Sequence, residues 1–369
     1  MGSASPEVVV TGIGLVSALG PDARSNWAKL LQGETAISLR QPFPELPVVP
    51  LAMIDKCPST LQLLLDQAVN EALQDAHLQN QLPNCGVVIG SSRSYQALWE
   101  DVAAHYHQER QIPPGFDWLA MMPHMAAVTT AQCIGSTGPV LAPMAACATG
   151  LWALFQGSEL IRRGACDRVI AGAVEAPITP LGLAGFQQMG ALASQGCYPF
   201  DRQREGLVLG EGAAVVILES ADSARQRNVP SYGRILGFGF SADGHHVSAP
   251  DPAQKSSHFA LKACLQQAHL RFNEVDYIHA HGTSTKLNDA HEANLIQQVF
   301  SPELAISSSK GAVGHTLGAS GSMSAIFCLL SLQQQILPPC VGLSDPAFSL
   351  NFVRQARPKA VDVALCFSF

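Results

Sequence analysis

The chain has few charges and one long stretch with none. Asp, Glu, Lys and Arg make up 14% of its 369 residues, and none of them occurs between Trp118 and Ser158, whereas hydrophobic residues make up 47%. A chain of this length and composition can bury a large core, so disorder is excluded. The net charge of −7 lacks the basic excess of a nucleic-acid-binding protein, and we expect no nucleic-acid partner.

The uncharged stretch lacks the unbroken apolar run of a membrane helix. Proline, glycine and polar residues interrupt it at Pro123, His124, Gln132, Gly135, Gly138 and Pro143. We therefore expect a buried core segment and no membrane span. The N-terminal Met-Gly-Ser-Ala-Ser-Pro has no basic patch followed by an apolar segment, so no secretory signal is visible. These absences predict a cytoplasmic protein with reduced thiols.

Ten cysteines are present, but none forms a C-x-x-C pair. This spacing indicates neither a zinc site nor a disulfide framework, so no metal is expected. Cys147 stands apart, because it follows an apolar segment at the point where a helical pattern begins. A helix N-terminus favours thiolate over thiol and is typical of a nucleophile with a lowered pKa, although most buried cysteines are only small hydrophobic residues.

Three pairs of segments repeat in the same order along the chain. Residues 73–78 and 86–90 recur 192 positions later as 265–270 and 278–282, each copy with a helical Ala-His-Leu segment that leads to a short apolar strand. The other pairs are 8–14 with 233–239 and 147–150 with 318–321. The repeats predict two similar βα halves, residues 1–230 and 231–369, in an α/β layered fold with mostly parallel central sheets.

In the second half, a histidine occupies a position of the repeat where the first half has an apolar residue, and another histidine follows it. His281 takes the place of Ile89 at the end of the repeated strand, and His315 lies in the glycine-rich run 314–321. Equivalent strand ends of two related halves approach a common centre, so we expect both imidazoles to meet Cys147 there. A lone histidine is more often only a satisfied polar residue, and the glycines could serve packing alone.

Other polar residues near these histidines are candidate supports. Thr283 and Thr285 follow His281 and could hydrogen-bond its ring. Lys310 precedes His315 by five residues and is either a surface lysine or a half-buried ammonium. Asp289 and Glu292 offer carboxylate partners for it, and we expect Lys310 to pair with Glu292.

Taken together, the motifs resemble the β-ketoacyl-acyl carrier protein synthases, condensing enzymes with the thiolase-like fold. The resemblance covers nearly the whole chain and rests on ordered motifs that are individually weak. They are Val-Thr-Gly-Ile-Gly at 10–14, Ala-Cys-Ala-Thr-Gly at 146–150, Pro-Phe-Asp at 199–201, Gly-Glu-Gly-Ala at 210–213, His-Gly-Thr at 281–283, Asn-Asp-x-x-Glu at 288–292 and Lys-x-x-x-Gly-His at 310–315. The two histidines resemble the elongating Cys-His-His class.

The resemblance implies a layered α-β-α-β-α architecture, a homodimer and decarboxylative Claisen condensation. Cys147 would take an acyl group from a carrier-protein thioester, and His281 and His315 would stabilise the enolate formed from the malonyl thioester of a second carrier. The partner implied is an acyl carrier protein, loaded with acyl or malonyl groups on its phosphopantetheine arm. No metal or redox cofactor is implied, in either a fatty-acid or a polyketide pathway.

The chain departs from the family pattern at three places. Ser284 replaces a usual Gly, and Leu207 stands where Phe is common near the substrate pocket. The family also continues beyond Cys366-Phe-Ser-Phe369 into a Gly-Phe-Gly-Gly segment that supplies a gating Phe and an oxyanion N–H, so we expect an extended chain to be more active.

Two other functions fit part of the pattern. A silent chain-length-factor-like subunit usually lacks the cysteine, which is present here. A degradative thiolase needs a second catalytic cysteine, and Cys366 lies in an apolar strand pattern without a glycine-rich setting.

Overall fold

Uninterrupted apolar runs form the strands of the larger sheet. The computed structural model describes residues 6–79, 81–246 and 248–369. In this part of the chain six strands pair in the order β5-β4-β6-β7-β1-β8. Their bounds are β1 (Val8–Ser17), β4 (Gly86–Gly90), β5 (Val140–Leu141), β6 (Arg168–Glu175), β7 (Gly212–Ser220) and β8 (Gly233–Arg234). β4, β5 and β6 run parallel, whereas β7 and β1 run antiparallel to their neighbours.

A second, parallel sheet comes from the C-terminal part of the chain. Its described strands follow the order β12-β10-β9-β14. Their bounds are β9 (Tyr277–His279), β10 (Ala305–Ser307), β12 (Asn351–Phe352) and β14 (Ala364–Cys366). In both sheets parallel strands end at one edge, so residues that follow them can share a site.

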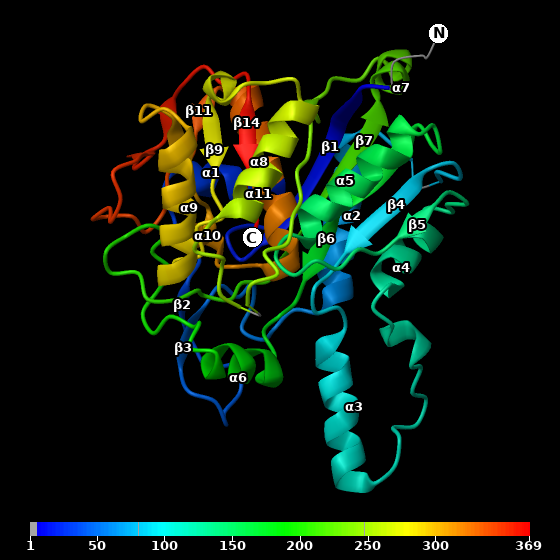
Figure 1. Ribbon diagram of the computed structural model, residues 1–369. Helices are drawn as coiled ribbons and strands as arrows, with labels where there is room; N and C mark the ends of the chain where they lie inside the picture. The colour runs from blue at the N-terminus through cyan, green and yellow to red at the C-terminus, as the bar shows by residue number, and fades with distance from the viewer. Residues whose placement is uncertain (1–5, 80, 247) are drawn as a thin grey trace.

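Two helices lie between the sheets and others cover their outer faces (Figure 1). α5 (Thr149–Arg162) packs on β4 and β6, α11 (Ser320–Gln334) packs on β9 and β14, and the two helices contact each other. α2 (Leu61–Asp75) and α4 (Met125–Cys133) cover the larger sheet, and α8 (Lys255–Gln267) and α9 (Lys286–Val299) cover the smaller one. The expected α-β-α-β-α layers are confirmed.

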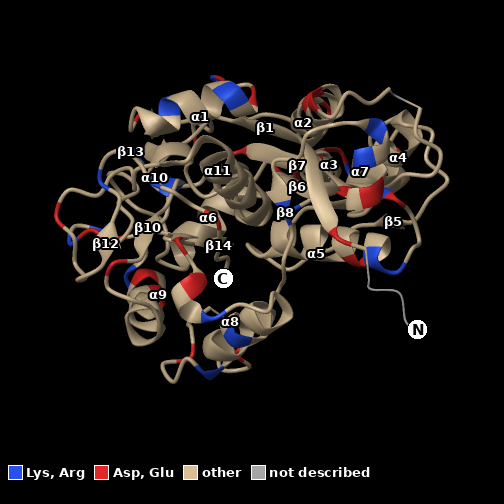
Figure 2. Ribbon diagram, turned by 90° about the horizontal axis from the view of Figure 1, so that it is seen from above, with Lys and Arg blue, Asp and Glu red and all other residues tan. Residues whose placement is uncertain are grey.

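The central layer contains a helix without charged residues. α11 contains no Asp, Glu, Lys or Arg, and most of its residues are buried. Figure 2 shows charged residues mainly on the outer helices and loops. No helix in the described ranges combines the length and apolar character that crossing a bilayer requires. The uncharged stretch 118–158 instead supplies α4, β5 and most of α5.

One repeat is weaker in the structure than in the sequence. Residues 233–239, which echo β1, form only the two-residue strand β8. β8 pairs antiparallel with β1 at the edge of the larger sheet, through Val9 and Val10. The backbone hydrogen bonds at Tyr232 and Ile235 likewise go to β1, so this segment extends the first sheet.

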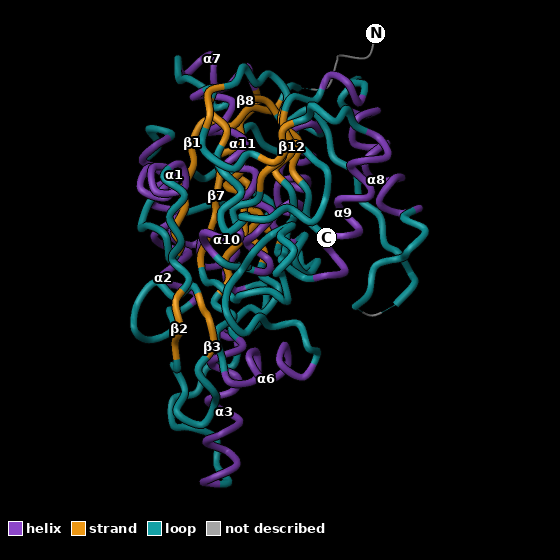
Figure 3. Tube along the Cα trace, turned by 90° about the vertical axis from the view of Figure 1, so that its left-hand side faces the viewer, coloured by secondary structure: helices purple, strands orange, loops and turns teal. Residues whose placement is uncertain are grey.

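A helical excursion extends away from the sheets (Figures 1 and 3). It consists of α3 (Gln96–Glu109) and the chain that returns to α4, and no residue of α3 is buried. The remaining elements are short: α1 (Ala23–Leu31), β2 (Ser38–Arg40), β3 (Val49–Leu51), η1 (Leu119–Met121), α6 (Pro180–Gln188), α7 (Ala221–Arg227), η2 (Phe272–Glu274), α10 (Lys310–Val313), η3 (Leu317–Ala319), β11 (Ile336–Leu337) and β13 (Arg357–Pro358).

Candidate active site

Cys147 lies on a sharp turn immediately before α5. Ala148 is the N-cap of the helix, and Ala146 has a left-handed φ of 47°. Thr149 closes the turn, since its hydroxyl accepts a hydrogen bond from the Ala145 N–H (2.8 Å) and donates one to the Ala146 carbonyl (2.7 Å). A non-glycine residue in the left-handed region of backbone conformation costs about 1–3 kcal/mol, so the surrounding contacts must hold Ala146 there. The predicted helix start is confirmed.

His281 comes from the end of β9, where a buried carboxylate holds the backbone. Glu292 on α9 accepts hydrogen bonds from the His281 N–H (2.6 Å) and the Gly282 N–H (2.8 Å). Gly282 has a φ of 48°, and a Cβ there would lie 2.7 Å from the Ser308 hydroxyl. A glycine is therefore needed at this turn.

His315 is held at both its backbone and its ring. Its N–H donates to the Val208 carbonyl (2.7 Å), and its carbonyl accepts from the Gly210 N–H (3.0 Å). The ring atom Nδ1 accepts a hydrogen bond from the Leu317 N–H (3.2 Å) and lies 2.9 Å from the Ser320 hydroxyl. These contacts connect the ring to the start of α11.

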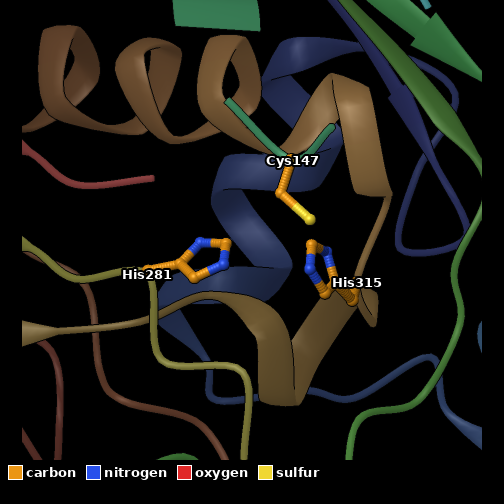
Figure 4. A group of neighbouring side chains, drawn as sticks. All are labelled: Cys147, His281 and His315. Carbon is orange, nitrogen blue, oxygen red and sulfur yellow. The ribbon is translucent and has the colours of Figure 1, made fainter. Parts of the chain in front are cut away.

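The three side chains converge on one point (Figure 4). The Cys147 sulfur and one ring nitrogen each of His281 and His315 lie within 4.8 Å of one another. The imidazole centroids are 5.2 Å apart and their planes are nearly perpendicular, at 83°. The structure thus brings together the thiol and both histidines, from segments far apart in the sequence.

Burial sets the protonation of this cluster. It raises the pKa of Cys147 to about 11, although the nearby Lys310 opposes the shift, so the expected lowering by the helix start is wrong for the unliganded protein. Burial and the Lys310 charge hold the pKa of His281 and of His315 well below 6.5. The resting site therefore contains a thiol and two neutral imidazoles.

The hydrogen bonds to Nδ1 define which ring nitrogen carries the proton. A backbone N–H can only donate, so His315 Nδ1 is an acceptor, and the Lys310 ammonium lies 3.3 Å from His281 Nδ1. Both rings consequently present Nε2–H. By distance alone the cluster could hold a thiophilic cation such as Zn²⁺, but metal-binding imidazoles usually donate from the nitrogen that does not bind the metal. The hydrogen-bond pattern is suited to an anionic ligand.

Lys310 and Glu292 both bind the backbone of the turn at His281 and do not form an ion pair with each other. Lys310 Nζ donates to the His281 carbonyl, and no ion pair joins it to Glu292 among the described residues. The predicted direct pairing is wrong, because Glu292 is occupied by two backbone N–H groups. Burial raises the pKa of Glu292 to about 7 and lowers the pKa of Lys310, and each charge opposes the other's shift.

The other proposed supports act on the backbone. Asp289 accepts from the Phe200 N–H (2.7 Å) and the Ser284 N–H (3.1 Å), so it is not the partner of the Lys310 ammonium. Thr283 and Thr285 bond each other through their hydroxyls (2.9 Å) and not the imidazole. Thr285 also caps α9. These three residues shape the turn around His281 without touching its ring nitrogens.

A cavity of about 1760 Å³ opens onto the cluster, and Leu207 is among its lining residues. Leu207 belongs to an apolar group with Leu183, Leu209 and Leu317, against which Cys147 packs. Leu207 therefore lies in the wall of the cavity, where a residue of the substrate pocket is expected. Thr283 and Thr285 line the same cavity.

Sequence reasoning missed four residues that contact this site or hold it in place. Ser320, five positions after His315, was visible only as the small residue that begins a helix. Ser368 donates to the Cys147 carbonyl (2.8 Å), and the ring centroid of Phe369 is 5.9 Å from that of His281. Glu175, at the end of β6, accepts hydrogen bonds from segments far away in sequence. The only feature of the sequence that points to Glu175 is its place as a single carboxylate at the end of an apolar strand.

Comparison with known proteins agrees with this geometry. Residues 55–224 match the N-terminal domain of the beta-ketoacyl synthases, and residues 232–344 match the C-terminal domain. The chain belongs to the beta-ketoacyl synthase family. It is a thiolase-like condensing enzyme of the acyltransferase type, in fatty-acid or polyketide elongation.

Relatives resemble the chain over nearly its full length. A 3-oxoacyl-[acyl-carrier-protein] synthase 2 from Coxiella burnetii is 33% identical, with 98% of this chain and 95% of the relative covered. A putative mitochondrial synthase of the same type from Schizosaccharomyces pombe is 32% identical, with 98% and 96% covered. One solved structure, a type II polyketide synthase acyl-carrier protein in complex with its ketosynthase bound to the hexaketide, contains a chain with a TM-score of 0.92, 26% identity and coverage of 99% and 96%.

Proposed function

We propose that Cys147 is the nucleophile of a two-stage condensation. Its sulfur adds to the carbonyl of an acyl thioester, the carbon–sulfur bond to the carrier breaks, and the Cys147 proton leaves with the carrier thiol. The product is an acyl group on Cys147. The developing oxyanion lies where the positive end of α5 and the Cys147 N–H stabilise negative charge.

The two imidazoles serve the second stage. Loss of carbon dioxide from a malonyl thioester leaves its electron pair as an enolate, with charge on the thioester oxygen. Neutral His281 and His315 donate Nε2–H bonds to that oxygen. The enolate carbon then attacks the acyl carbonyl, and the bond to the Cys147 sulfur breaks. Lys310 and Glu292 keep His281 in place through the backbone and Nδ1.

The observation that carries this proposal is the group of one thiol and two neutral imidazoles within 4.8 Å. We expect mass spectrometry after incubation with an acyl-carrier protein to find the acyl group on Cys147 alone. Cys147→Ser should lower the condensation rate by at least roughly 10³-fold. An adduct on Cys366 in place of Cys147 would contradict the assignment.

An acyl carrier protein is the proposed partner, in line with the names of the curated relatives and with the ketosynthase complex. A silent subunit is disfavoured because the reactive group is complete. A thiolase is disfavoured because the Cys366 thiol contacts the Gly321 carbonyl (3.8 Å) and does not join the group of Cys147 and the histidines in the described chain. Release of carbon dioxide from malonyl-carrier protein separates the three functions.

We also propose that each chain folds as two halves, residues 1–230 and 231–369. Two such chains form a cytoplasmic homodimer. Support for the dimer comes from apolar side chains exposed on the α3 excursion and on the edge strand β5. They include Leu98, Trp99, Ile112, Trp118, Leu119, Val140 and Leu141. Covering such a surface favours association. Light scattering at micromolar concentration should give twice the chain mass, and a monomer would contradict the proposal.

A further inference from the structure

Glu175 is a buried carboxylate at the carboxyl end of β6. It is 0% exposed, and the described residues place no Lys, Arg or His within ion-pair distance of it. It accepts hydrogen bonds from the Ser91 hydroxyl (2.7 Å) and from the N–H groups of Ser92 and Arg93 (2.9 Å each). A carboxylate removed from water is costly unless it is well hydrogen-bonded, so these donors fix its position.

A further donor to Glu175 comes from the segment that follows His315. The Gly318 N–H donates to Oε2 at 2.8 Å. The approach is so close that a Cβ on Gly318 would lie 2.5 Å from the same oxygen. Glu175 thus connects the first half of the chain to the turn between His315 and α11.

Leu317, which directly precedes Gly318 in this turn, has an unfavourable backbone conformation. Leu317 has a φ of 39°, which side chains larger than glycine rarely adopt. In this conformation its N–H donates to His315 Nδ1 (3.2 Å). The Gly318 amide belongs to the next peptide along, so a fixed Gly318 limits the relaxation of Leu317.

We propose that Glu175 is a positioning residue that keeps the proton of His315 on Nε2, facing the enolate. It does so by anchoring Gly318, which holds Leu317 in the left-handed region with its N–H on Nδ1. This inference rests on the proposed role of His315. Without the anchor, Leu317 relaxes and the Ser320 hydroxyl remains beside Nδ1. A hydroxyl can donate or accept, so the ring then occupies both tautomers.

The tautomer can be read directly by ¹⁵N NMR of the full-length enzyme with labelled histidine. A His315→Gln variant identifies the His315 resonances by their loss. In Glu175→Gln one carboxylate oxygen becomes an NH₂ group, which cannot accept from the N–H groups around it. We expect a mixture of tautomers at His315 and a malonyl decarboxylation rate lowered about tenfold or more, with acyl transfer to Cys147 within twofold of wild type.

Gly318→Ala disrupts the same contact from the other side and should give the same signature while Glu175 is intact. Glu211→Gln is the matched control, because Glu211 is equally buried and accepts from the Ile54 and Ser59 N–H groups (2.9 Å each). It should lower stability without changing the His315 tautomer.

An unchanged Nε2–H tautomer in both Glu175→Gln and Gly318→Ala would overturn the inference, whatever the activities. Equal losses of acyl transfer and decarboxylation with that tautomer retained would also overturn it, since Glu175 would then only brace the fold. Failure of the proposed function gives a different result, in which His315→Gln itself decarboxylates at the wild-type rate.

Discussion

In the first half of the chain α2 leads to β4 and Ile89, and 192 residues later α8 leads to β9 and His281. Each helix is followed, directly after its C-cap, by a histidine of left-handed φ, 53° at His77 and 55° at His269. The next hydrogen bonds also match, from Leu78 N–H to the Leu73 carbonyl and from Leu270 N–H to the Leu265 carbonyl.

The side chains at the strand ends differ in surroundings. Ile89 is fully buried in the apolar core under α2 and α4, whereas His281 is buried beside another imidazole and a thiol. The backbone also differs, since Ile89 lies within β4, whereas His281 follows β9 by two residues and precedes the left-handed Gly282. The helix ends are repeated, and the residue type decides whether the position that follows serves packing or chemistry.

The largest expected effect comes from making the second copy resemble the first. His281→Ile introduces an apolar side chain of similar size and removes a donor to the enolate, so malonyl decarboxylation should fall about 10²–10³-fold. Acylation of Cys147 should fall much less. Carbon dioxide release and mass spectrometry measure the two stages. A loss of acylation as large as that of decarboxylation would show that His281 does not act on the enolate alone.

The reverse exchange should act on stability. Ile89→His places an imidazole among apolar side chains without a partner, which should cost roughly 2–4 kcal/mol in the free energy of unfolding. Denaturant titration measures the loss, with Ile89→Val as the control at about 0.5–1.5 kcal/mol. A loss no greater than that of the valine variant would mean that the two positions are interchangeable.

A third contrast concerns the residues before two helices. Cys147 lies just before α5, whereas only small residues lie just before α11. Since burial raises the pKa of Cys147 to about 11, the thiolate fraction rises about tenfold per pH unit below that value. Alkylation of Cys147 by iodoacetamide should therefore accelerate about tenfold per pH unit between pH 7 and 9, measured by mass spectrometry with the exposed Cys57 as a reference. A plateau near pH 7 would contradict this account.

The smallest effect tests the equivalence of the helix ends. A side chain in the left-handed region costs roughly 1–2 kcal/mol, which the greater freedom of glycine in the unfolded chain partly offsets. His77→Gly and His269→Gly should therefore each raise stability by up to about 1 kcal/mol. Thermal unfolding of both variants provides the comparison. A gain at one site and a loss at the other would mean that the two helix ends are held differently.

The repeats in the sequence predict an α/β layered fold and the meeting of Cys147, His281 and His315, and the family resemblance adds the order of the layers. The sequence does not predict which atoms of Lys310 and Glu292 are used, since both bind a backbone turn whose conformation no side-chain pattern shows. The pKa of Cys147 was missed for a similar reason. Burial depends on the packing of both halves, which outweighs the local effect of a helix start. Glu175 was missed because its donors lie 82–143 residues away.

The central claim is that the thiol of one half and the imidazoles of the other do separate work. Carbon dioxide release from malonyl-carrier protein by Cys147→Ala tests it most directly, with His281→Ala and His315→Ala measured alongside. We expect the cysteine variant to release carbon dioxide without forming a condensation product, and each histidine variant to lose release about 10²–10³-fold while still accepting an acyl group. Histidine variants that release carbon dioxide at the wild-type rate would contradict the claim.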